Sequence, residues 1–139
     1  MNSLKIILSL SLIVFSLSVT AQEVISCAMK QIGVPYRSGG INPKTGFDCS
    51  GLAYYCHNQK IPRSPQAQAA KNKISVSNRK PGDLLFFACG KTGSISHTVI
   101  YMGNDEFIEA PLPGMTVRRH KMNKYYCGGR IVSASRYWK

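Results

Sequence analysis

The residue in this sequence best suited to act as a nucleophile is Cys49, within the run FDCSGLAYYC at residues 47–56. Asp48 has a side chain that can cap the first turn of a helix. Cys49 then falls at the first helical position, where free N–H groups and the helix dipole favour a thiolate over a thiol. The thiolate is the reactive form in covalent catalysis. The alternative is a buried cysteine that acts as a small apolar side chain, so a base elsewhere in the chain must decide between the two.

A nucleophilic cysteine needs a base, and the sequence offers three histidines. His57 follows Cys49 on the same predicted helix, about two turns or roughly 12 Å along the axis, which is out of reach. His120 lies among basic residues and has no orienting neighbour. His97 begins a predicted strand after a Gly/Ser loop, and by elimination it is the candidate base.

A third group is expected to orient the base. The strands on either side of the Gly103-Asn104 turn are predicted to pair, with residues 97 and 109 nearly opposite each other. Glu109 could then accept a hydrogen bond from the His97 ring, which would fix its tautomer and favour the imidazolium. The alternative is a solvated strand carboxylate, but the apolar neighbours of Glu109 indicate partial burial.

Helix signals dominate the first half of the chain. Apolar residues recur at helical spacing over residues 23–32, and a second helix is predicted at residues 49–58. A Ser-Pro pair, typical of a helix start, precedes a short helix expected at residues 65–71. The glycines and prolines of residues 35–46 predict an irregular loop that walls one side of the thiol.

Strand signals dominate the second half, where short apolar runs are separated by turn residues. We expect strands at residues 84–88, 97–102, 106–110, 115–119 and 130–137, and a loop or short strand at residues 74–80. Helices followed by a meander of strands predict an α+β fold, with N-terminal helices packed on an antiparallel sheet of about five strands.

The N-terminal residues have the features of an export signal. Lys5 precedes an apolar, serine-rich stretch at residues 6–19, and Val19-Thr20-Ala21 is a small-residue cleavage signal. We therefore predict a signal peptide at residues 1–21 and a single mature domain at residues 22–139. An uncleaved anchor is the alternative, but the stretch is short and serine-rich for a membrane span. The expected product is secreted or extracytoplasmic, without stable membrane insertion.

The chain is strongly basic, with a formal net charge of +12 over 139 residues. Such a surplus favours acidic partners, including nucleic acid, anionic lipid or a bacterial wall polymer. The cations are scattered apart from the run at residues 118–121, and no basic surface studded with aromatic residues indicates a nucleic-acid partner. For most of these residues a solvated surface is the alternative.

Five cysteines in an oxidising compartment leave one thiol over. With Cys49 free, the other four can form two disulfides in three possible connectivities. We favour Cys27–Cys56 between the first two helices and Cys89–Cys127 between loops of the sheet. No spacing of Cys and His resembles a zinc site, so neither a metal nor another cofactor is expected.

Four segments resemble, in their order and spacing, the NlpC/P60 family of cysteine peptidases. They are PYRSGG at residues 35–40, FDCSGL at 47–52, PGDL at 81–84 and SHTVIYMGN at 96–104. The match extends over almost the whole predicted mature chain. It implies a papain-like α+β fold and hydrolysis of peptides of bacterial peptidoglycan, in many members between γ-D-glutamyl and a diamino acid such as meso-diaminopimelate.

The resemblance also implies residue roles. They are Cys49 as nucleophile, His97 as base, Glu109 as third polar member, Tyr36 as a tyrosine near the site, and Asp48 and Ser50 as groups that hold the free L-alanyl amine of the substrate. In the family the third member is usually His, with Asn or Gln also found. A carboxylate at this position orients an imidazole as well as an amide does and stabilises its cation more strongly, so we expect activity with a shifted pH profile.

These features together predict a secreted, monomeric cysteine peptidase that hydrolyses peptidoglycan or muropeptides through an acyl-enzyme. One alternative is a different reaction on the same fold, by an N-acetylmuramoyl-L-alanine amidase or an acyltransferase. The bond that is cleaved separates these. The other alternative is a non-catalytic basic protein that binds walls, which would retain its binding after the thiol is blocked.

Overall fold

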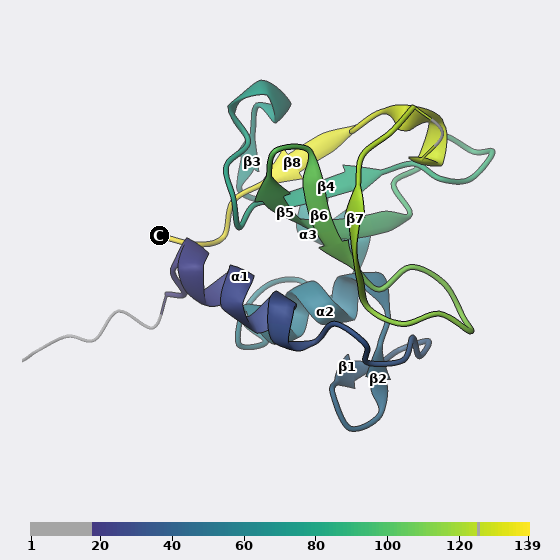
Figure 1. Ribbon diagram of the computed structural model, residues 1–139. Helices are drawn as coiled ribbons and strands as arrows, with labels where there is room; N and C mark the ends of the chain where they lie inside the picture. Colours follow the sequence, from purple (N-terminus) through teal and green to yellow (C-terminus); the bar gives the residue numbers. More distant parts are fainter. Residues whose placement is uncertain (1–17, 125) are drawn as a thin grey trace, which may run out of the picture.

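The computed structural model describes residues 18–124 and 126–139. Figure 1 shows two helices, α1 and α2, packed together on one face of an antiparallel sheet. The fold is therefore α+β, as predicted. The predicted signal peptide lies outside the described residues, apart from residues 18–21. No helix in the described ranges is long and apolar enough to cross a membrane.

Each α-helix begins at a side chain that caps its first turn. Thr20 accepts a hydrogen bond from the Glu23 N–H, so the first helix starts two residues earlier than predicted. Asp48 and Ser64 cap the next two helices in the same way. The helices are α1 at Ala21–Lys30, α2 at Cys49–Cys56 and α3 at Pro65–Ala69.

The main sheet has six strands in the order β3-β8-β4-β5-β6-β7, and every neighbouring pair is antiparallel. The sixth strand is the short β3, which pairs with β8 in the segment predicted as a loop or short strand. The strands are β3 at Lys73–Ile74, β4 at Leu84–Phe87, β5 at His97–Gly103, β6 at Glu106–Glu109, β7 at Arg118–Lys121 and β8 at Ser133–Ser135. Two 3₁₀ helices, η1 at Val76–Asn78 and η2 at Tyr126–Gly129, lie in its connections.

The segment predicted as an irregular loop, residues 35–46, contains part of a small hairpin. Its strands are β1 at Ile41–Asn42 and β2 at Gly46–Phe47. Two-residue strands are too short to show the alternating pattern from which strands are predicted.

The β5–β6 pairing differs from the predicted register. Ile100 pairs with Ile108 and Gly103 with Glu106, with an irregularity between Tyr101 and Gly103. Glu109 therefore lies level with Val99, and the prediction that it is nearly opposite His97 is wrong by two residues. The extra residue and the turn, in which Asn104 and Asp105 have positive φ, account for the shift. His97 and Glu109 still share one face, because positions two apart on a strand point the same way.

Both faces of the sheet are covered by apolar residues. Leu84, Phe86 and Ile100 pack toward the helices. The alternate residues Leu85, Phe87 and Val99 pack under the loops on the other face, and the whole of β4 is buried. This explains the continuous apolar run in that strand.

Two disulfides connect these layers. Cys27–Cys56 joins α1 to the end of α2, and Cys89–Cys127 joins the loop after β4 to η2. Both predicted pairings are confirmed, and Cys49 is the free cysteine.

Candidate active site

Cys49 is the first residue of α2, as predicted. The Asp48 carboxylate accepts a hydrogen bond of 2.7 Å from the Gly51 N–H and so fixes the first turn. A side chain at Gly51 would overlap the Gly40 carbonyl oxygen, so glycine lets the loop of residues 37–40 lie directly against the helix start. The thiol therefore has a rigid base at a helix N-terminus, where a negative charge is favoured.

His97 begins β5 and contacts the thiol. The side chain of His97 is 9% exposed, and its Nε2 lies 3.4 Å from Glu109 Oε1, which leaves Nδ1 for the thiol. Burial alone would lower the pKa of His97, but the contacts with Cys49 and Glu109 outweigh burial and raise it to about 9. Burial likewise favours the neutral thiol, yet hydrogen bonding and charge from His97 lower the pKa of Cys49. The site therefore favours a thiolate–imidazolium pair.

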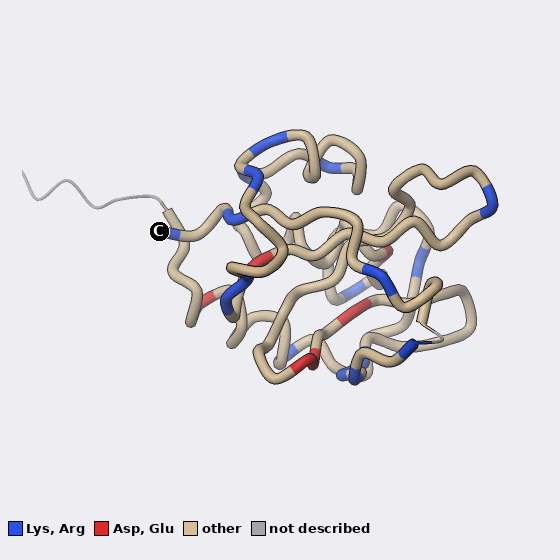
Figure 2. Tube along the Cα trace, turned by 90° about the horizontal axis from the view of Figure 1, so that it is seen from above, with Lys and Arg blue, Asp and Glu red and all other residues tan. Residues whose placement is uncertain are grey.

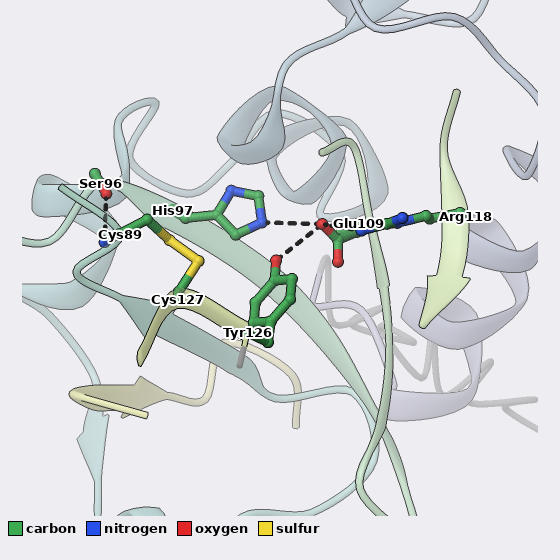
Figure 3. The surroundings of a disulfide bond; sticks show 7 residues. All are labelled: Cys89, Ser96, His97, Glu109, Arg118, Tyr126 and Cys127. Carbon is green, nitrogen blue, oxygen red and sulfur yellow. Dashed lines mark hydrogen bonds and ion pairs between the residues drawn. A yellow bond between two sulfur atoms is a disulfide. The ribbon is translucent and has the colours of Figure 1, made fainter. Parts of the chain in front are cut away.

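Glu109 is 1% exposed and faces more than one partner (Figure 3). The Tyr126 hydroxyl donates a 2.8 Å hydrogen bond to Oε1, the oxygen that faces His97. The Arg118 guanidinium lies 3.8 Å from the same oxygen. These contacts rule out the alternative of a solvated strand carboxylate.

The other two histidines lie apart from the thiol. His57 is buried at the end of α2, where its Nδ1 lies 2.7 Å from the Ala53 carbonyl and burial lowers its pKa. His120 packs against the rings of Phe107 and Tyr126. Neither lines the cavity at Cys49, as expected from the sequence.

A cavity of about 420 Å³ opens at these groups. It contains four of the six predicted site residues, namely Tyr36, Cys49, His97 and Glu109. The rest of its wall consists of Cys89, Ser96, Pro111, Leu112, Arg118, Tyr126 and Cys127. Burial, and then the negative charges of Cys49 and Asp48, raise the pKa of the Tyr36 hydroxyl, which therefore stays a neutral donor.

The other two predicted residues, Asp48 and Ser50, flank Cys49 but do not line this cavity. Arg63 joins them, because its guanidinium donates to Asp48 Oδ2 at 2.7 Å and to Ser50 Oγ at 2.8 Å. Asp48 Oδ2 also accepts from the Gly39 N–H at 3.0 Å. A large part of the hydrogen-bonding capacity of this pair is thus used within the protein.

Comparison with known proteins identifies the family. The NlpC/P60 family matches residues 33–136, which includes every candidate residue above. The chain belongs to the NlpC/P60 family. The resemblance in the four sequence segments is thereby confirmed.

Two curated relatives and one solved structure illustrate the likeness. The murein DD-endopeptidase MepH of Escherichia coli is 38% identical over 115 residues, which are 78% of this chain and 42% of that protein. The gamma-DL-glutamyl hydrolase of Bacillus subtilis is 45% identical over 92 residues, 63% of this chain and 22% of that one. The crystal structure of an NlpC/P60 family protein from Bacillus cereus gives a TM-score of 0.78 at 28% identity, covering 88% of this chain and 41% of that one. The chain thus spans less than half of each.

Sequence reasoning missed several polar residues of this NlpC/P60 site. Tyr126 and Arg63 lie 17 and 15 residues from their partners along the chain, and Arg118 lies opposite Glu109 on the neighbouring strand β7. Gln68 is a fourth: its fully buried amide donates to the Ser50 carbonyl at 3.1 Å and accepts from the Thr98 hydroxyl at 2.9 Å. It thereby ties the helix that carries the thiol to the strand that carries the imidazole. The one available signal was the position of Tyr126 beside a cysteine.

The described chain shows no group of three or more His, Cys, Asp or Glu side chains that could hold a metal ion.

Proposed function

We propose that this protein is a secreted cysteine peptidase that hydrolyses the stem peptides of peptidoglycan, at the bond between γ-D-glutamyl and a diamino acid such as meso-diaminopimelate. The observation that carries the proposal is the free Cys49 at the start of α2 in contact with His97, whose other ring nitrogen faces Glu109. The names of the two curated relatives, an endopeptidase and a hydrolase, support the reaction class.

In the first half of the reaction, the Cys49 thiolate attacks the carbonyl carbon of the scissile amide. The Cys49 N–H, at the first position of α2, has no partner within the helix and is a donor for the developing oxyanion. The C–N bond breaks while the His97 imidazolium gives its proton to the leaving amine, so a thioester and a free amine result.

In the second half, water attacks the thioester carbonyl. Neutral His97 accepts the proton of this water, the C–S bond breaks, and the carboxylic acid product leaves with Cys49 again a thiolate. Glu109 keeps the imidazole oriented in both halves and stabilises its cationic form.

Substrate binding is proposed to involve Tyr36, Asp48 and Ser50. Tyr36 lines the cavity as a neutral hydrogen-bond donor. Asp48 and Ser50 would hold the free amine of an L-alanyl terminus. Because Arg63 already shares both side chains, this amine would compete with a guanidinium for Asp48.

That competition favours a second candidate, the cleavage of a D,D-peptide cross-link, in which no free L-alanyl amine is needed. The similarity to a protein named as a murein DD-endopeptidase points the same way. The two candidates share the acyl-enzyme chemistry and differ only in the bond that enters the cavity.

Export and attraction to the wall complete the proposal. Residues 1–21 would direct export, and the mature monomer would act outside the cytoplasm on peptidoglycan, with nucleic acid not among its partners. Lys and Arg are spread over the described molecule, while acidic residues are few (Figure 2). A basic protein of this kind is concentrated on anionic polymers.

The test is mass spectrometry of defined monomeric and cross-linked muropeptides after incubation with the protein or with Cys49→Ala. Thiol-dependent cleavage of monomers after γ-D-Glu is the expected result. It releases L-Ala-γ-D-Glu where the L-alanyl amine is free, and leaves the same dipeptide attached to the sugar where it is not. Cleavage of cross-linked dimers alone would instead establish the second candidate. Release of the intact stem peptide would identify an amidase, and equal products from Cys49→Ala would contradict the proposal altogether.

A further inference from the structure

Two cationic side chains, His97 and Arg118, lie near the carboxylate of Glu109. Its Oε1 lies 3.4 Å from His97 Nε2 and 3.8 Å from an Arg118 nitrogen. Its second oxygen, Oε2, is buried and has no hydrogen-bond partner in the described ranges. Arginine is permanently charged and can bind a carboxylate with two parallel hydrogen bonds. Without a further hydrogen bond to hold it, the carboxylate of Glu109 would rotate away from His97 and toward Arg118.

Tyr126 opposes that rotation. Its hydroxyl donates a 2.8 Å hydrogen bond to the same Oε1 that faces His97. Burial, and then the charge of Glu109, raise the pKa of the Tyr126 hydroxyl, so it remains a donor throughout the working pH range. The ring is held among Phe87, Phe107 and His120. The hydroxyl therefore reaches the carboxylate from a rigid support.

The second disulfide fixes Tyr126 in this place. Cys127, the next residue, has φ 44° and is bonded to Cys89. The Cys89 N–H donates a 3.0 Å hydrogen bond to Ser96, the residue before His97 (Figure 3). The disulfide thus connects the segment that carries the tyrosine to the segment that carries the imidazole, and both of its cysteines line the cavity.

We infer that Tyr126 is a positioning residue that keeps Glu109 directed at His97 rather than at Arg118, and that the Cys89–Cys127 disulfide holds Tyr126 in place for this purpose. The inference rests on the proposed function of the Cys49–His97–Glu109 group. It adds to that function a requirement that the second disulfide be intact.

The titratable and charged groups that face this part of the site come from each neighbouring element. They are Asp48 and Cys49 at α2, Tyr36 before β1, Arg118 and His120 of β7, and Tyr126 of η2. Of these groups, only Tyr126 is altered in the variant Tyr126→Phe.

The test is the rate at which iodoacetamide alkylates Cys49, measured against pH in Tyr126→Phe, which keeps the ring. This neutral reagent reacts with the thiolate and needs no peptide substrate, so it tests the inference even where no peptide is cleaved. Once Glu109 turns to Arg118, the imidazolium loses a partner that stabilises it, so the pKa of His97 falls and the thiolate–imidazolium pair is lost at lower pH. We expect the upper step of the alkylation profile, at which the imidazolium loses its proton, to move down by roughly one pH unit, and kcat on a cleaved peptide to fall roughly tenfold with KM within about twofold.

Two controls match the loss of a hydroxyl and the loss of a disulfide. The Tyr137 hydroxyl donates a 2.6 Å hydrogen bond to the Gln68 carbonyl, outside the cavity, so Tyr137→Phe should keep the wild-type profile. Cys89→Ala/Cys127→Ala should reproduce the shift of Tyr126→Phe, and combining the two changes should add nothing further. The matched control for the disulfide is Cys27→Ala/Cys56→Ala. The Cys27–Cys56 bond closes a loop of 29 residues and the Cys89–Cys127 bond one of 38, so the two losses are similar in size, but removing Cys27–Cys56 should not shift the profile.

A wild-type alkylation profile in a folded Tyr126→Phe variant would overturn the positioning role. Equal profiles for the two disulfide variants would overturn the role of Cys89–Cys127. A loss of thermal stability without a change in the profile would reduce both features to structural supports.

Discussion

The pH range in which the site can work is set by two side chains whose pKa values are shifted in opposite directions. The pKa of Cys49 is lowered and that of His97 is raised to about 9, both chiefly by their mutual contact acting against burial. Below the range the thiolate is protonated, and above it the imidazolium that must protonate the leaving amine is lost. In the folded protein the stabilisation from charged His97 is complete below its ordinary pKa and is lost as the pH rises through about 9.

Replacing Glu109 by Gln tests the carboxylate directly. The amide can still orient the ring but supplies no charge, so the pKa of His97 falls. We expect the alkaline limb of the kcat/KM profile to move to lower pH by roughly one unit, with partial activity retained at neutral pH. The matched control is Glu106→Gln on the same strand, where the carboxylate pairs with exposed Arg119 instead. An alkaline limb that coincides with the wild type would show that Glu109 does not support the imidazolium.

At the residue scale, the sequence was sufficient where the required chemistry restricts the residue type. A thiol at a helix start limits the choice to Cys49, and elimination among three histidines leads to His97. The hydrogen-bond partners of Glu109 could not be found in this way. Tyrosine and arginine have many structural uses, and only the folded chain brings Tyr126 and Arg118 to the carboxylate.

At the scale of elements, the first helix shows how a correct pattern can give a wrong boundary. The sequence predicts a cleavage signal at residues 19–21 and a helix only from residue 23, where the apolar periodicity begins. In the structure, however, Thr20 caps α1 and Val19 is 7% exposed within the core. The Lys139 N–H also donates to the Val19 carbonyl. Cleavage after Ala21 would therefore remove residues that the fold uses.

A comparison of chains that start at Ser18 and at Gln22 tests this contribution. The shorter chain lacks the Thr20 cap, which is worth about 1 kcal/mol, and the buried Val19 side chain, worth about 1.5 kcal/mol or more. It also places a charged amine at the helix start. We expect a lower free energy of unfolding in urea for the shorter chain, and Thr20→Ala in the longer chain isolates the cap. Identical urea midpoints for both chains would show that residues 18–21 contribute nothing to the fold.

The strands with long apolar runs were predicted correctly from the sequence, whereas the pairing register across a short turn was not. The β4 and β5 runs are apolar enough to be recognised, since both of their faces are covered. The register of β5 with β6 depended on a bulge and a two-residue turn with positive φ at Asn104 and Asp105, which the sequence does not specify uniquely. His97 and Glu109 are neighbours in spite of the different register, because side chains two positions apart on one face of a sheet remain within reach of each other.

At the scale of the whole molecule, the positive charge has little internal compensation. The chain has 18 Lys and Arg but only six Asp and Glu. Across the described ranges, the acidic partners of the ion pairs are bound by arginines and by His97. Lysines at positions 60, 71, 73 and 91 are exposed instead. These lysines lie outside the cavity and give the surface a field that attracts anionic polymers.

Salt should therefore separate binding to the wall from chemistry in the cavity. Between low salt and about 0.3 M NaCl the screening length falls well below 10 Å. We expect hydrolysis of insoluble anionic walls to slow several-fold over this range, while hydrolysis of a short, soluble stem peptide with little net charge changes little. Replacing Lys60, Lys71, Lys73 and Lys91 by Gln should reduce the salt dependence on walls and leave the rate on the soluble peptide unchanged. Parallel salt dependence for both substrates would instead place the charge effect within the cavity, which Arg118 and charged His97 line.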